Sequence, residues 1–113
     1  MINQFEIWLA DLNPRMGTES GKKKPVLIVQ TDLLNHISHP STIVCPLTTN
    51  TSSEVDILRV QLSAQTDYLH QARDIMIDQI RAIDNRRLVK KLGELPDNLI
   101  ARVKENIQIC LDL

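Results

Sequence analysis

Apolar residues gather in short runs along the first half of the chain, and this pattern predicts β-strands. Residues 6 to 12 (EIWLADL) are apolar on both parities of a two-residue period, as in a strand covered on both faces. The aliphatic and β-branched run at residues 26 to 29 (VLIV) predicts a central strand, and residues 42 to 47 (TIVCPL) predict a third. The polar stretch between the first two contains two glycines, so we expect a loop there.

Two further strands are expected in the second half. Residues 55 to 62 (VDILRVQL) alternate between apolar and polar, but the parity changes near Leu58 and Arg59, which predicts a bulge or a bend. Residues 74 to 84 (DIMIDQIRAID) are interpreted as one strand whose apolar set is interrupted by polar residues.

The pattern changes after Leu95-Pro96, where apolar residues begin to recur with helical spacing. These residues are Leu99, Ile100, Val103, Ile107, Cys110 and Leu111. They predict a terminal helix that packs through one face. Strands followed by one packed helix indicate a mainly β fold with helical additions (α+β), either an antiparallel sheet or a small barrel. With 113 residues, 42% of them hydrophobic, we expect one domain, residues 1–113, around a single core.

The charge balance changes this picture only locally. The chain has 13 basic and 14 acidic residues, so its net charge of -1 gives no general attraction to nucleic acid or membrane. Residues 15–24 and 86–91 are nevertheless rich in lysine and arginine. If these two stretches meet in space they form an anion-binding surface, and the alternative is an ordinary solvated basic face. Aromatic residues make up only 3%, which argues against a single-strand binder built on aromatic stacking.

Several classes of site are excluded or disfavoured by spacing. Cys45 and Cys110 lack the paired spacing of a metal site, so we interpret them as small buried residues in a reducing compartment. The loop between the first two predicted strands, which contains two glycines and three lysines, lacks the GK[ST] ending of a P-loop. It is also followed by a strand instead of a helix. No segment approaches the roughly 18 apolar residues of a membrane span, so we expect a cytoplasmic protein.

Four ordered motifs carry a family resemblance. The segments EIWLADLNP, GTESGKKKPVLIVQTD, TIVCPLT and DQIRAID, the last followed by RLVKKLGEL, resemble the successive motifs of the MazF/PemK toxins of bacterial toxin–antitoxin systems. The resemblance covers nearly the whole chain. It implies a small SH3-like antiparallel barrel of the CcdB/PemK type with a C-terminal helix, assembled as a homodimer.

The resemblance also implies an activity and a partner. Such toxins cleave single-stranded mRNA at selected sequences without a metal ion or other cofactor. A cognate antitoxin of the MazE/PemI type keeps them inactive by covering the RNA groove with an extended acidic tail.

The resemblance assigns catalysis to two positions, which are Lys24 and Thr48 in this chain. Thr48 matches the family's threonine, whereas Lys24 stands where the family motif has an arginine. A lysine keeps the positive charge but lacks the planar fork with which a guanidinium binds two phosphate oxygens. Without the family context, a β-branched residue that closes a strand is the favoured interpretation of Thr48.

Five further residues are candidates for RNA binding. They are Thr18, Glu19, Lys22, Lys23 and Gln79. The loop residues Thr18 and Glu19 are also suited to turn or capping roles, and Gln79 to a position facing solvent.

Two alternative functions share the expected fold. The first is a weakened or inactive family member that binds antitoxin and RNA, suggested by the lysine at position 24. The second is a DNA gyrase poison of the CcdB type, which the retained PLT motif disfavours.

Overall fold

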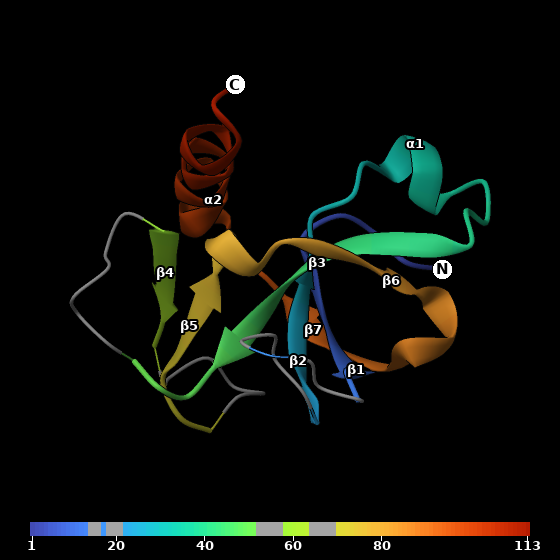
Figure 1. Ribbon diagram of the computed structural model, residues 1–113, viewed down its shortest axis with the longest axis horizontal. Coiled ribbons are helices and arrows are strands. Elements are labelled where there is room, and N and C mark those ends of the chain that lie inside the picture. The colour runs from blue at the N-terminus through green and yellow to red at the C-terminus, as the bar shows by residue number, and fades with distance from the viewer. Residues whose placement is uncertain (14–16, 18–21, 52–57, 64–69) are drawn as a thin grey trace.

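The computed structural model describes residues 1–13, 17, 22–51, 58–63 and 70–113. Their elements, in chain order, are β1 (Glu6–Asp11), β2 (Lys23–Ile28), α1 (Asp32–Asn35), β3 (Ser41–Thr48), β4 (Arg59–Leu62), β5 (Arg73–Met76), the 3-10 turn η2 (Ile77–Gln79), β6 (Arg81–Asp84), the 3-10 turn η3 (Asn85–Arg87), β7 (Leu88–Glu94) and α2 (Asp97–Leu111). Figure 1 shows α2 beside β4 and β5 at one end of the molecule and α1 at the other.

The strands form one antiparallel sheet. Of the seven strands in the described part of the chain, six follow the order β4-β5-β3-β2-β1-β7, and the seventh, β6, pairs with β3. The mainly β fold with a C-terminal helix is therefore confirmed, and β1, β2 and β3 match the strands predicted at residues 6–12, 26–29 and 42–47. None of the helices described is long and apolar enough to cross a membrane.

The single strand predicted over residues 74–84 is wrong, because β5, η2 and β6 divide that segment. Leu47 of β3 lies opposite Ile75, and Val44 lies opposite Arg81. Three steps along β3 thus correspond to six steps along the other segment. The extra residues cannot stay in the ladder, and they fold into the turn η2, which lets one segment pair with both halves of β3.

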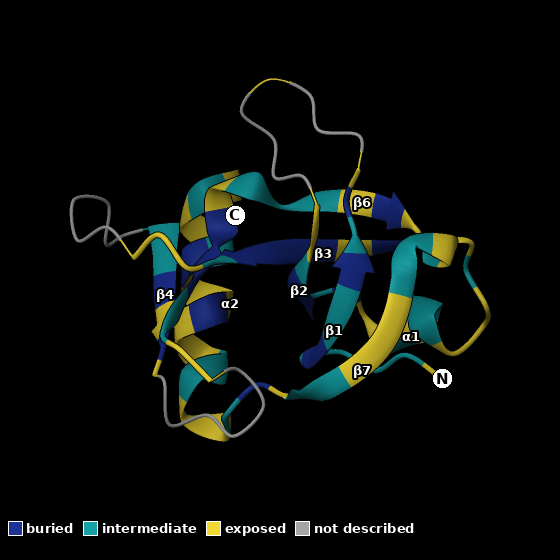
Figure 2. Cartoon of the chain, turned by 90° about the horizontal axis from the view of Figure 1, so that it is seen from below, coloured by how far each residue is buried: buried dark blue, intermediate teal, exposed yellow. Residues whose placement is uncertain are grey.

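Two other sequence expectations need revision. Of the strand expected at residues 55–62, β4 occupies Arg59–Leu62, and residues 55–57 lie outside the described residues. The strand β7 was missed because its residues are half-buried or exposed and give no apolar alternation. Figure 2 shows this contrast, with β3 largely buried and β7 largely exposed.

The core consists of two clusters of buried residues instead of one. The first packs around α2 and contains Ile7, Leu27, Cys45, Leu47, Val60, Leu62, Ile75, Ile77, Leu95 and Val103. The second contains Ala10, Leu12, Val26, Ile28, Val44 and Ile83. Neighbouring residues of β2 and β3 belong to different clusters because side chains alternate between the two faces of a strand. The sheet therefore has an apolar cluster on each face.

A buried carboxylate joins β1 to β7. Glu6 is only 4% exposed and accepts hydrogen bonds from the Asn3 backbone (2.8 Å) and the Trp8 indole (3.0 Å). The ammonium of Lys91 on β7 lies 2.9 Å away. Burial raises the pKa of Glu6, but the hydrogen bonds from Trp8, Lys91 and Asn3 outweigh it and lower the pKa from 4.5 to about 2.

This pKa shift predicts a pH-dependent contribution to stability. Because the pKa is lowered on folding, the stabilisation is present above about pH 4.5 and is lost as the pH falls toward 2. The shift corresponds to about 2 to 3 kcal/mol once the exposure of Lys91 is allowed for. We expect Glu6→Gln to lower the free energy of unfolding by about that amount at pH 7, and urea titrations from pH 7 to 2 measure it.

The matched control is Glu94→Gln, since Glu94 lies 3.5 Å from the same ammonium but its side chain is 74% exposed. We expect that variant to change stability by less than about 0.5 kcal/mol. A difference between Glu6→Gln and the unmodified protein that persisted at pH 2 would contradict the assigned cause.

Candidate functional site

Alternation along the two central strands directs the two candidate catalytic residues to one face of the sheet. Val26 of β2 lies opposite Pro46 of β3 in the last pair of their ladder, and Lys24 and Thr48 each lie two residues beyond that pair on the same side of their strands. Residues opposite each other in an antiparallel pair project to the same face of the sheet. Lys24 and Thr48 therefore share one face at the end of the β2–β3 ladder, where both are half-buried.

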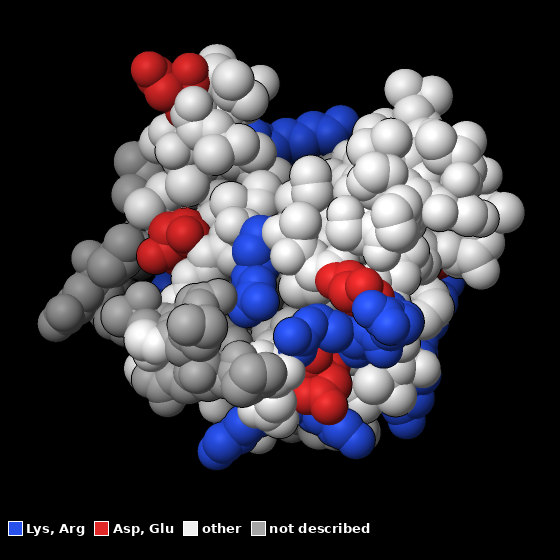
Figure 3. All heavy atoms as spheres, turned by 45° about the vertical axis from the view of Figure 1, so that its right-hand side comes forward, with Lys and Arg blue, Asp and Glu red and all other residues white. Residues whose placement is uncertain are grey.

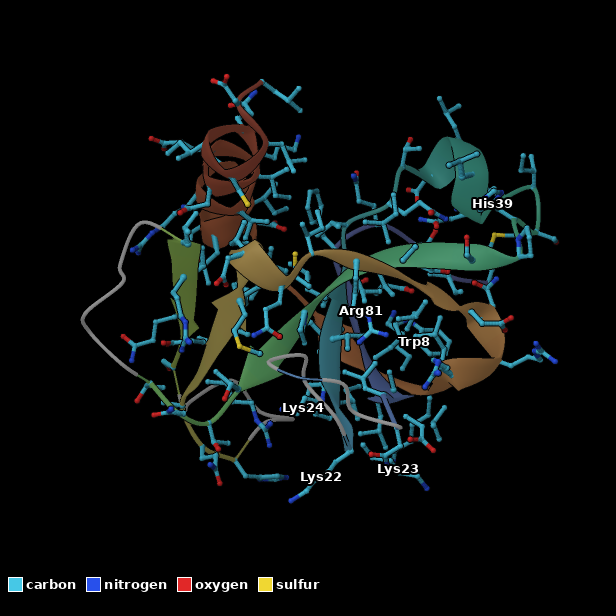
Figure 4. All side chains as sticks on the ribbon, viewed as in Figure 1. Trp8, Lys22, Lys23, Lys24, His39 and Arg81 are labelled. Atoms are coloured by element: carbon cyan, nitrogen blue, oxygen red, sulfur yellow. The ribbon has the colours of Figure 1, made fainter. Side chains whose placement is uncertain are left out.

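Two further polar side chains project to this face. Trp8 of β1 lies opposite Val26, and Arg81 of β6 lies opposite Val44. Figure 4 shows Trp8 and Arg81 near the middle of the sheet, with Lys24 nearer the end of β2. We call this surface, defined by Trp8, Lys24, Thr48 and Arg81, the lysine–threonine face.

Thr48 begins a turn whose backbone its own side chain stabilises. The Asn50 N–H donates to Thr48 Oγ1 at 3.2 Å, and the Thr51 N–H donates to the Thr49 carbonyl at 3.0 Å. A hydroxyl that accepts one hydrogen bond still has its own proton to donate. Thr48 can therefore donate to an anionic oxygen bound at the lysine–threonine face.

The other two lysines of the loop project differently. Lys23 lies opposite Asp11 of β1, which puts its side chain on the face away from Lys24. Lys22 precedes β2 with a φ of 65°, and its N–H donates to Asn13 Oδ1 at 2.7 Å. Figure 4 shows both side chains at the edge of the molecule, where both residues are exposed.

The remaining candidates are only partly described. Gln79 ends η2 and is half-buried. Thr18 and Glu19 lie outside the described residues, so their relation to the lysine–threonine face stays a prediction.

The two basic stretches approach each other at the end of β1. The Arg87 guanidinium donates to the carbonyl oxygens of Asp11 (3.1 Å) and Asn13, and the same Asn13 side chain accepts from the Lys22 backbone. Beside them lies a cavity of about 390 Å³ lined by Asp11, Asn13, Asp84, Arg86 and Arg87. The two stretches therefore do meet in space at this point.

Acidic neighbours nevertheless offset much of this charge. Arg86 forms an ion pair with Asp84 at 3.0 Å, and its hydrogen bonds lower the pKa of that carboxyl to about 2. Lys91 pairs with Glu6 and Glu94. Figure 3 shows lysine and arginine side chains next to acidic ones on this side of the molecule. The end of β1 is therefore a mixed surface and not a uniformly basic one.

Comparison with known proteins identifies the family. The family model described as "PemK-like, MazF-like toxin of type II toxin-antitoxin system" matches residues 3–111. The chain is 33% identical over 113 residues to endoribonuclease EndoA of Bacillus subtilis, covering 100% of this chain and 97% of the relative. The chain belongs to the PemK/MazF toxin family.

Solved structures confirm the fold of this family. MazF from Deinococcus radiodurans superposes with a TM-score of 0.83 at 22% identity, covering 99% of this chain and 97% of that one. Toxin MazF-mt6 of Mycobacterium tuberculosis gives 0.79 at 23% identity, covering 96% and 97%. A mycobacterial endoribonuclease, solved in complex with its cognate antitoxin, gives 0.81 at 19% identity, covering 100% and 97%.

Sequence reasoning missed several polar residues around the site of this PemK/MazF toxin. Arg81 is part of the DQIRAID motif. A charged residue within a predicted strand could have marked it as a candidate for the site. Arg59 and Asp74 lie 3.4 Å apart beside the Thr48 turn, although they are fifteen residues apart in sequence. No local spacing connects such a pair, because only the β4–β5 register brings it together.

A metal centre has little support from these side chains. Within the described ranges, no group of three or more histidine, cysteine, aspartate or glutamate residues could hold a metal ion. The ammonium, hydroxyl and guanidinium of the lysine–threonine face suit an anionic substrate, whereas the indole N–H of Trp8 already donates to Glu6.

Proposed function

We propose that this PemK/MazF toxin is an endoribonuclease that cleaves single-stranded mRNA at selected sequences in the cytoplasm. One observation carries the proposal: Lys24 and Thr48 each lie two residues beyond the Val26–Pro46 pair, on strand positions that face the same side of the sheet. The family match over residues 3–111 and the 33% identity to a named endoribonuclease support it. The similarity to an endoribonuclease favours RNA cleavage over poisoning of DNA gyrase.

The proposed chemistry uses the RNA's own 2′-hydroxyl. That hydroxyl attacks the adjacent phosphorus, the bond to the 5′-oxygen breaks, and the products carry a cyclic phosphate and a free 5′-hydroxyl. The Lys24 ammonium neutralises charge that grows on the non-bridging oxygens, and the Thr48 hydroxyl donates a hydrogen bond to one of them. Lys22, Lys23, Thr18, Glu19 and Gln79 are the further residues proposed to bind RNA.

We further propose that the chain acts as one domain, residues 1–113, in a homodimer controlled by an antitoxin. MazF from Deinococcus radiodurans has been solved together with MazE, and the mycobacterial relative with its cognate antitoxin. An acidic antitoxin tail matches the lysine–threonine face because a carboxylate can occupy the place of a phosphate beside Lys24 and Arg81.

The direct test is cleavage of a mixed-sequence RNA in EDTA, with mapping of the product ends. We expect the protein to give cyclic-phosphate ends and Thr48→Ala to lower kcat by about 10² to 10³, since it removes one transition-state donor. Thr49→Ala is the control, because Thr49 is exposed beside it. Intact RNA at high protein concentration would remove the proposal.

The two neighbouring lysines provide a second test. Because Lys24 and Lys23 project to opposite faces, we expect Lys24→Ala to lower kcat at least about 100-fold and Lys23→Ala less than about tenfold. Single-turnover cleavage of the same RNA measures both. Equal losses for the two variants would be inconsistent with the assigned face.

The departure from the family's arginine is tested by restoring it. A guanidinium binds two phosphate oxygens in a fixed plane, so we expect Lys24→Arg to raise kcat roughly tenfold. The pH profile of kcat is recorded for both proteins. Abolished cleavage in Lys24→Arg would instead assign a proton-transfer role to lysine, since arginine cannot give up its proton.

A further inference from the structure

An ion pair lies behind the turn that presents Thr48. The Asp74 carboxylate on β5 and the Arg59 guanidinium on β4 are 3.4 Å apart, and their side chains are 6% and 22% exposed. Asp74 lies directly opposite Thr48 in the β3–β5 ladder, so both side chains project to the same face. A buried carboxylate is thus set beside the residue proposed to bind an anionic phosphate.

Arg59 also holds the backbone of the turn. Its Nη1 atom, which faces Asp74, donates to the carbonyl oxygen of Asn50 at 2.9 Å. The N–H of the same Asn50 donates to Thr48 Oγ1 at 3.2 Å. Arg59 therefore fixes Asn50 through its carbonyl, and Asn50 in turn fixes the side chain of Thr48 through its N–H.

This chain of contacts restricts the positions open to the Thr48 proton. A threonine side chain has three staggered rotamers. The hydrogen bond that Oγ1 accepts favours the rotamer in which this bond can form. Once one lone pair of Oγ1 accepts from the Asn50 N–H, the O–H bond cannot point toward that N–H and is left to the remaining positions around the oxygen. Loss of the Asn50 anchor would release this rotamer and its donor direction.

The same guanidinium cancels the charge of Asp74. An unpaired carboxylate next to Thr48 would repel a bound phosphate, and in a buried site this repulsion is weakly screened. Arg59 thus affects the lysine–threonine face in two ways. It holds the turn after Thr48 through the Asn50 carbonyl, and it neutralises Asp74, the acidic residue opposite Thr48.

We propose that Arg59, held by Asp74, is a positioning residue that sets the Thr48 hydroxyl for RNA cleavage. The proposal rests on the proposed endoribonuclease function. It differs from direct phosphate binding by Arg59, in which the guanidinium itself would contact RNA.

The test compares Arg59→Met with Arg59→Lys, and with the double variant Arg59→Met/Asp74→Asn. The double variant guards against misfolding, since it removes the carboxylate that Arg59→Met alone would leave buried and unpaired. Arg102→Met on the exposed side of α2 is the matched control. Thermal unfolding confirms that each variant is folded.

We expect Arg59→Met and the double variant to lower kcat about tenfold or more, with KM changed by less than about threefold. Arg59→Lys, which can still donate to the Asn50 carbonyl, should restore most of kcat. The slope of RNA affinity against salt should be unchanged in all of them, because no phosphate contact is lost. An unchanged kcat in the double variant overturns the proposal, and so does a raised KM with a salt slope smaller by about one, which marks direct phosphate binding.

NMR of the free protein separates this proposal from the function on which it rests. We expect one dominant Thr48 rotamer and a protected Asn50 amide in the parent protein, and rotamer averaging with faster amide exchange in the double variant. If the parent protein fails to cleave RNA, the proposed function fails and this measurement alone decides on the positioning role. An unaltered Thr48 rotamer in the double variant overturns the role whatever the activity.

Discussion

The register between β2 and β3 is the constraint on which the rest of this structure depends. It sets Val26 against Pro46 and sends alternate side chains to the two apolar clusters on opposite faces of the sheet. A slip of one residue would exchange the two faces of β2. Lys24 would then point toward the cluster that packs around α2, and the core residues of β2 would leave the clusters in which they are buried. The buried aliphatic run of β2 therefore fixes the position of the lysine at its end.

The long strand β3 extends this control to the other side of the site. Its two halves pair with β5 and β6, and the turn η2 absorbs the residues that a continuous strand could not place. This break lets Asp74 lie opposite Thr48 while Arg81 lies opposite Val44. A single uninterrupted strand in the β5 register would have put Asp78 opposite Val44, and an acidic side chain would then have taken the place of the guanidinium.

Sequence reasoning found the parts of this fold that local pattern determines. The aliphatic run of β2 and the helical spacing of α2 are properties of neighbouring residues, and both elements form where the pattern predicts. The strand β7 was not predicted because pairing with β1 and the Glu6–Lys91 contact stabilise it. Neither interaction produces a local pattern in the sequence. Lys24 and Thr48 were predicted from family motifs and stay a prediction, whereas the contact between Arg59 and Asp74 depends on a register that the sequence does not display.

In the proposed reaction, the lysine at position 24 makes the contribution of Thr48 more important. An ammonium on a flexible stem supplies charge but imposes little direction, whereas a guanidinium supplies both. Under the proposed mechanism, directional binding of a phosphate oxygen depends more on Thr48, whose Oγ1 accepts from Asn50, the residue that Arg59 holds. Because this orientation comes from hydrogen bonds within the folded chain, it exists before substrate arrives and costs no reorganisation during the reaction. If both proposals hold, an oriented donor combined with a less directional cation is a physically consistent way to keep a precise site without the arginine.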